Sequence, residues 1–170
     1  MATNDEALAD RLRLIRNQGM RKGYDYETLG LNLRMPEIEA SILSVQMDRL
    51  EGFIEARRRN ARLLSEGLDG LGIELPKELE GMRYNWYLYT IATEDRDGLL
   101  NHLNEEGVEA RVYYDPPVHL SGLYSKHGIR LPKTKYASKR ILSLPVHQKL
   151  DREAMSKIVE LIKIFIRKGK

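Results

Sequence analysis

The chain of 170 residues contains no cysteine. Disulfide bridges, thiolate metal sites and a cysteine nucleophile are therefore excluded. The sequence also lacks an apolar run near the roughly 20 residues that a membrane-spanning helix requires, and its start has no apolar signal-peptide segment. We therefore expect a cytoplasmic protein that does not contact a membrane.

The sequence has no large excess of positive or of negative residues. Hydrophobic residues make up 42% of the chain and charged residues 31%, with a net charge of +3, which is typical of a globular protein. This charge permits nucleic-acid binding without demanding it. The basic run at 57–59 is interpreted as a solvated helix face. Residues 121–140 hold six Lys/Arg and no Asp/Glu, which indicates either a phosphate-binding region or a flexible basic loop.

Known catalytic and metal-binding spacings are also missing. The four histidines lack metal-ligand spacing, and no Ser, Thr or Lys lies in a recognisable nucleophile motif. We therefore predict no metal site, and spacing alone assigns no catalytic residue.

What is present falls into three parts: residues 1–35, 36–70 and 71–170. The first part opens with a helix, for which Thr3 and Glu6 stand in capping-box register and Gly19 is a natural stop. Leu8, Leu12 and Ile15 share one face of this helix. Because the chain begins almost directly on the helix cap, we expect that this part is the remnant of a larger domain.

A second helical pattern runs from Pro36 to Gly70. Globular helices typically have about 8–20 residues, and this pattern sustains no heptad. We therefore predict a long helix that bridges two domains. The segment before it, with Asn32 and Arg34, is expected to be extended and to lead to a helix start, where anions bind favourably.

Residues 71–170 have the pattern of a small α/β domain. Aromatic and β-branched residues predict strands at 84–93, 108–114 and 142–146. Helices are predicted at 95–107, with Asp95 as cap and Gly107 as stop, at 134–141, and from Asp151 onward.

Several segments occur together in a particular order: "TNDEALADRLRLIRNQGM", "LGLNLRMPEIEASILSVQMDRLEGFIEARRRNARLLSEGL", "GVEARVYYDPPVHLSGLY" and "ILSLPVHQKLDREAMSKIVELIK". In this order the chain resembles the DegT/DnrJ/EryC1/StrS aminotransferases, fold-type-I enzymes that use pyridoxal phosphate to aminate keto sugars carried on nucleotides. The resemblance implies an α/β fold equal to the C-terminal part of such an enzyme: the end of the large domain, a long bridging helix and a small α/β domain.

The same resemblance implies what the chain does not carry. The lysine that binds pyridoxal phosphate in this family lies in the large domain, and none of the lysines here stands in that context. We therefore expect the isolated chain to be catalytically incomplete, as a fragment or as one half of a split enzyme.

The resemblance also implies site residues. Asn32 matches the family position that reaches the phosphate of the neighbouring subunit's cofactor, and Arg34 faces the same region, which implies a homodimer formed around Asn32 and the first helix. The alternative is that Asn32 caps a turn and Arg34 pairs with a carboxylate. Tyr113, Tyr114 and His119 match a segment near the sugar-nucleotide site, although Asp115 departs from the usual pattern there.

A second function remains open: a non-enzymatic interaction or nucleic-acid-binding module that retains this fold. A reading frame that continues upstream into a lysine-bearing domain would decide for the enzyme.

Overall fold

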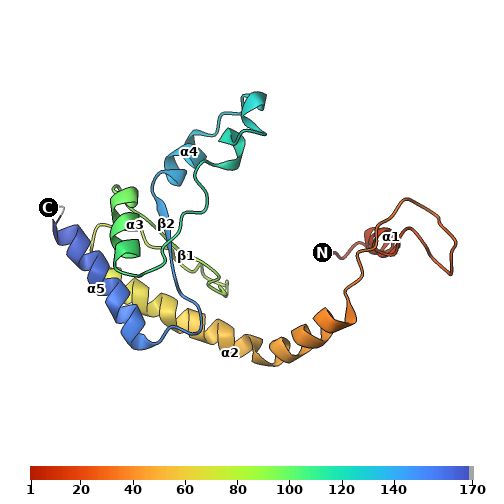
Figure 1. Cartoon of the computed structure of the whole chain (residues 1–170), viewed down its shortest axis with the longest axis horizontal. Coiled ribbons are helices and arrows are strands. Elements are labelled where there is room, and N and C mark those ends of the chain that lie inside the picture. Colours follow the sequence, from red (N-terminus) through yellow and green to blue (C-terminus); the bar gives the residue numbers. More distant parts are fainter. Residues whose placement is uncertain (169–170) are drawn as a thin grey trace. The chain divides into compact units, whose positions relative to one another are not determined.

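The computed structural model describes residues 1–168 and divides the chain into two units, one ending at Arg49 and the other beginning at Leu50. The helices and strands, in chain order (Figure 1), are α1 (Glu6–Arg16), α2 (Glu37–Leu68), β1 (Tyr89–Ala92), α3 (Arg96–Glu105), the short 3-10 turns η1 (Val118–Leu120) and η2 (Ser125–His127), α4 (Pro132–Ser138), β2 (Ile141–Leu144) and α5 (Arg152–Lys168). The long helical pattern is thus confirmed as one helix of 32 residues. No helix within residues 1–168 is long and apolar enough to cross a membrane.

The first unit is built around α1. The expected capping box is wrong in detail: Asp5 is the cap and accepts from Leu8 N at 3.0 Å, while the Thr3 hydroxyl accepts from Asp5 N. A carboxylate on the residue just before the helix satisfies a free N–H and is also stabilised by the positive end of the helix dipole. None of the side chains of α1 is buried within the described chain.

The segment before α2 is tied to the C-terminal end of α1. Leu31 N donates to Ile15 O at 2.8 Å, and Gln18 N donates to Leu31 O at 3.0 Å. The two backbones cross so closely that a Cβ on Gly19 would lie 1.7 Å from Thr28 O. Gly19 also has a φ of +79°, so no other residue fits both constraints.

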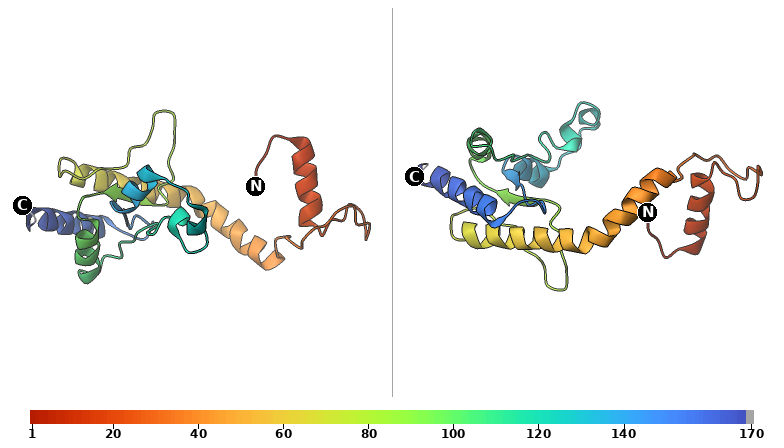
Figure 2. Two further views of the ribbon diagram at one scale, coloured as in Figure 1. Left: turned by 90° about the horizontal axis from the view of Figure 1, so that it is seen from above. Right: turned by 60° about the horizontal axis from the view of Figure 1, so that its bottom comes forward.

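The second unit has a small sheet with helices packed against it. β1 and β2 pair antiparallel, with Tyr89 opposite Leu144. α3 and α5 lie side by side, as the views in Figures 1 and 2 agree, and the His102 ring stacks on Phe165. The core residues that are essentially inaccessible to solvent are Ala61, Leu64, Leu68, Tyr89, Ile91, Leu99, Leu103, Leu142, Met155 and Ile162.

Two predicted strands are largely absent. Of 84–93, only Tyr89–Ala92 is a strand, because the amide of Tyr84 donates to the Glu78 carboxylate instead of to a neighbouring strand. Of 108–114, only Arg111 pairs, exchanging both backbone hydrogen bonds with Ser143. The amide of Ala110 donates to the side chain of Asn104. Side-chain acceptors therefore take the amide donors that a ladder would have used.

Helix boundaries in this unit agree better with the sequence. Asp95 caps α3 by accepting from Gly98 N at 3.0 Å, and Asp151 Oδ1 accepts from Ala154 N at 2.8 Å at the start of α5. The cap predicted at Asp95 and the helix start predicted at Asp151 are confirmed. The helix expected at 134–141 begins earlier, at Pro132, because proline is well suited to the first helical turn.

Candidate functional site

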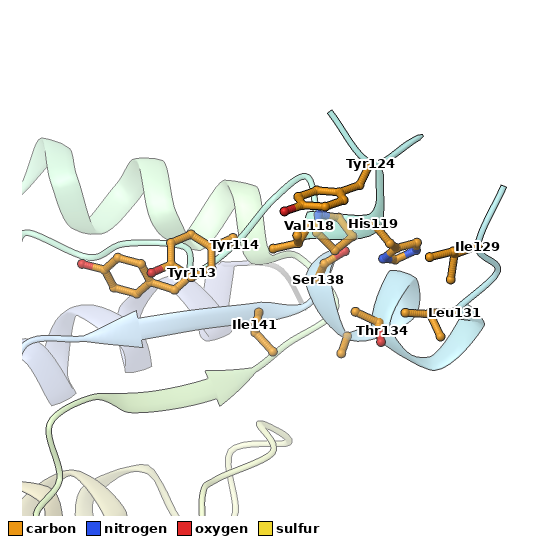
Figure 3. Close-up of a pocket in the computed structure, with 12 residues that line it drawn as sticks. Tyr113, Tyr114, Val118, His119, Tyr124, Ile129, Leu131, Thr134, Ser138 and Ile141 are labelled. Carbon is orange, nitrogen blue, oxygen red and sulfur yellow. The ribbon is translucent and has the colours of Figure 1, made fainter. Parts of the chain in front are cut away.

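A pocket of about 470 Å3 lies in the second unit, between the 113–119 segment and α4. Figure 3 shows the side chains that line it. The lining residues are Tyr113, Tyr114, Pro117, Val118, His119, Tyr124, Ile129, Leu131, Thr134, Ala137, Ser138 and Ile141. The three residues predicted to lie near a sugar nucleotide thus share one cavity.

His119 is the most buried of these three residues. It lies in η1, which follows Pro117, and only 9% of its surface is exposed. Figure 3 shows its imidazole on the side of the pocket formed by Ile129 and Leu131. Tyr113 and Tyr114 form the other side, with their rings edge to face and 5.4 Å between centroids. The pocket therefore has a buried imidazole at one side and two phenol rings at the other.

The lining is mostly apolar, and its few polar groups are uncharged. It contains three tyrosine hydroxyls, the hydroxyls of Thr134 and Ser138 and one imidazole, and none of its described residues is Asp, Glu, Lys or Arg. Such a surface can hydrogen-bond the hydroxyl and carbonyl groups of a neutral ring and stack against its faces. The positive charge lies on the chain segment around the pocket, where Lys126, Arg130 and Lys133 are exposed.

Sequence reasoning missed Tyr124, Thr134 and Ser138 as pocket residues. Tyr124 ends one of the segments that carry the family resemblance, and Thr134 and Ser138 lie in the helix predicted at 134–141, but no binding role was assigned to any of them. Ser138 is buried, and its hydroxyl donates to Lys135 O at 3.0 Å. The available signal was the clustering of small and hydroxyl-bearing residues on the face of a short helix that begins at a proline.

Asn32 and Arg34 lie in the first unit, on the segment that leads to α2. Asn32 forms an isolated bridge with Asn17, and Arg34 Nε donates to Asn32 Oδ1 at 3.1 Å. Both side chains are exposed. An amide and a guanidinium held together supply several N–H donors on one surface, and this donor set suits a phosphate dianion.

Among residues 1–168, no three or more His, Asp or Glu side chains are grouped so that they could hold a metal ion.

Comparison with known proteins shows the family to which the chain belongs. Residues 1–163 match the DegT/DnrJ/EryC1/StrS aminotransferase family, and the chain belongs to this family. It is 38% identical over 172 residues to a pleiotropic regulatory protein of Geobacillus stearothermophilus, with 97% of the chain and 46% of that protein covered. It is 34% identical over 167 residues to the dTDP-3-amino-3,4,6-trideoxy-alpha-D-glucose transaminase of Streptomyces venezuelae, with 96% of the chain and 44% of the transaminase covered.

Solved structures agree in fold. The chain superposes on DesV of S. venezuelae, solved in complex with a ketimine intermediate, with a TM-score of 0.91 and 32% identity, covering 97% of the chain and 46% of DesV. It superposes on a DegT DnrJ EryC1 StrS aminotransferase from Brucella abortus with a TM-score of 0.88 and 37% identity. This superposition covers 96% of the chain and 44% of the Brucella protein. The expected fold class is confirmed.

The chain spans a little under half the length of the relatives that it matches. Aminotransferases of this family depend on pyridoxal phosphate. The alternative of a non-enzymatic or nucleic-acid-binding module finds no support in the comparisons.

Proposed function

We propose that this chain is the C-terminal portion of a pyridoxal-phosphate-dependent aminotransferase that acts on keto sugars of nucleotide-sugar biosynthesis. The observation that carries the proposal is that Tyr113, Tyr114 and His119 line one pocket in a chain that matches the family over residues 1–163. Relatives of the chain include transaminases of dTDP-linked and UDP-linked sugars.

In this proposal the pocket binds the neutral part of the substrate. The tyrosine rings stack on a flat ring face, and the hydroxyls of Thr134 and Ser138 with the His119 imidazole hydrogen-bond its polar edge. These residues exclude water and orient the substrate.

Asn32 and Arg34 supply donors for the cofactor phosphate of the neighbouring subunit in a homodimer formed around Asn32 and α1. The geometry that supports this role is the exposed pair of N–H-bearing side chains joined by a hydrogen bond of 3.1 Å. Pyridoxal phosphate, when bound, supplies the electron sink for amino-group exchange. The lysine that carries it is expected in the upstream domain, so the chain alone is catalytically incomplete.

The test uses this chain together with a domain that carries the cofactor-binding lysine, either joined to it in one polypeptide or supplied as a partner chain. The protein is loaded with pyridoxal phosphate and an amino donor and is given dTDP-, UDP- and GDP-linked keto sugars, and products are identified by mass spectrometry. We expect conversion of a keto sugar nucleotide to its amino sugar. Failure with every one of these substrates by a folded, cofactor-loaded protein would contradict the proposal.

A matched pair of variants tests the pocket. Tyr124→Phe removes a hydroxyl from the lining, whereas Tyr136→Phe removes one from an exposed ring on α4 outside the lining. We expect a raised KM for the first variant and unchanged kinetics for the second.

A further inference from the structure

One arginine of the second unit is buried. Arg96 is the first residue of α3, and only 3% of its surface is exposed. Its Nη2 donates to Asp115 Oδ2 at 2.9 Å. A guanidinium is rarely buried unless it is paired, because removing its charge from water is costly. Two carboxylates pair with it: Arg96 Nε also lies 2.6 Å from Asp97 Oδ1, but the Asp97 side chain is 77% exposed, so Asp115 is the more buried partner.

Asp115 is held from a second direction. Lys139 Nζ lies 3.0 Å from Oδ2 and 3.2 Å from Oδ1 of the same carboxylate. Hydrogen bonds from Lys139 and Arg96 lower the pKa of Asp115 below its usual value. The carboxylate thus joins three segments: the start of α3, the 113–119 segment and the C-terminal end of α4.

These three residues adjoin the pocket without lining it. Asp115 directly follows Tyr114, and Lys139 directly follows Ser138, whereas neither charged residue is part of the lining. Asp115 is followed by Pro116 and Pro117, whose φ angles are fixed by their rings. An orientation imposed at Asp115 is therefore transmitted along a stiff chain toward His119.

We propose that Arg96 is a positioning residue: through Asp115 it fixes the 113–119 segment so that Tyr113, Tyr114 and His119 face the pocket. The effect of Arg96 on substrate binding rests on the proposed function. The ordering of the 113–119 segment by Arg96 does not depend on it. Arg96 contributes more than Lys139, because the lysine side chain is 64% exposed and exposed ion pairs are weak.

The test uses the complete enzyme with Asp115→Asn, which keeps the size of the side chain and removes its charge. The matched control is Glu78→Gln. Glu78 is also a partly exposed carboxylate held by an arginine, with Arg58 Nη1 at 2.7 Å, and it does not line the pocket. The measurements are hydrogen exchange of residues 111–123, the melting temperature, the affinity for dTDP and UDP as probes, and the separate values of kcat and KM.

We expect Asp115→Asn to speed amide exchange in residues 111–123 and to raise KM by roughly tenfold with little change in kcat, because a disordered pocket weakens ground-state and transition-state binding alike. Glu78→Gln should leave the amide exchange of residues 111–123 and the KM unchanged, even if it lowers the melting temperature. Equal exchange in the two variants, or a loss of kcat with unchanged KM, would overturn the proposal.

A cycle of variants checks that Arg96 acts through Asp115. The double variant Arg96→Met with Asp115→Asn should change amide exchange and KM no more than Arg96→Met alone, since the effects of coupled residues are not additive. Arg96→Lys, which keeps the charge, should recover part of the ordering. Additive effects would contradict the proposal. If Arg96→Met does not fold, Arg96→Lys alone and combined with Asp115→Asn serves for the same comparison. A wild-type enzyme that aminates no keto sugar would overturn the proposed function alone, because the exchange data still decide the role of Arg96.

Discussion

Arg34 donates a hydrogen bond from Nε to the side-chain oxygen of Asn32, at 3.1 Å, on the extended segment before α2. The bond engages the acceptor of the amide and leaves its NH2 as a donor. It also holds the positive charge of the guanidinium beside that donor. The arrangement favours an anionic partner over a cationic one.

Asn32→Ala in the complete enzyme should weaken binding of pyridoxal phosphate. A hydrogen bond to a charged group contributes about 1.5–3 kcal/mol, so the affinity should fall by roughly ten- to a hundred-fold. Folding should change little, because the side chain of Asn32 is exposed. Cofactor titration followed by absorbance, beside a thermal melt, separates these effects. A lowered melting temperature with unchanged affinity would mean that Asn32 is only a turn residue.

A mixed dimer tests whether Asn32 serves the neighbouring subunit. Asn32→Ala is paired with a subunit whose cofactor lysine has been replaced. The one site with an intact lysine is then completed by the unmutated Asn32 of the other subunit and should bind pyridoxal phosphate with wild-type affinity. Weak binding at that site would contradict a contact across the dimer.

The 170-residue chain alone should not form a lysine adduct with pyridoxal phosphate at one site. None of its lysines has the family context for that bond. Incubation with the cofactor, reduction with borohydride and peptide mass spectrometry should find only scattered, substoichiometric labelling. One fully labelled lysine, with turnover of a keto sugar nucleotide, would refute the expectation.

The isolated chain should self-associate. α1 buries none of its side chains, Leu8 is 42% exposed, and Leu29 is 95% exposed. Burying an apolar side chain contributes roughly 1.5–3 kcal/mol, which favours a dimer. Light scattering over a concentration series should show association. Leu29→Asp should reduce it, whereas Leu79→Asp, an exposed leucine in the second unit, should not; a monomer at high concentration would oppose the prediction.

Stability should depend on pH through Glu78. The pKa of Glu78 is lowered by the hydrogen bond from Arg58 and by that from the amide of Tyr84. A carboxyl with a lower pKa in the folded state stabilises the protein above its unfolded-state pKa of about 4.3, and this stabilisation is lost as pH falls through the folded-state pKa.

Glu78→Gln should therefore lower the denaturation midpoint at pH 7 and should converge with the wild type in acid. The control is Glu80→Gln, an exposed glutamate two residues later, which should follow the wild type at both pH values. Curves for Glu78→Gln that stay parallel to the wild type from neutral pH into acid would contradict this linkage.

Leu142→Ala should destabilise the second unit strongly. Leu142 lies in β2 and is 0% exposed. Removing a buried leucine side chain typically costs about 2–5 kcal/mol, from lost burial and from the cavity left behind. Urea denaturation followed by circular dichroism measures the change. A change below about 1 kcal/mol would show that the core around β2 relaxes around the cavity.

Some features of the chain were predictable because they depend on neighbours in sequence. Asp95 and Asp151 were identified as helix starts, since a cap needs only an acceptor side chain a few residues before the amide it bonds. The 32-residue length of α2 follows from the continuous helical pattern. The order of the motifs was also enough to place the chain in its family.

The tertiary structure decided what depends on residues far apart in the chain. The strand at 108–114 shrank to one bridge because Asn104 takes an amide donor and only Ser143 offers a full pair at Arg111. Periodicity cannot detect such competition. The family resemblance predicted Tyr113, Tyr114 and His119 as site residues, and the fold places Tyr124, Thr134 and Ser138 in the same pocket as these three. A pocket is formed by packing between segments, and packing is not encoded in the spacing of any one segment.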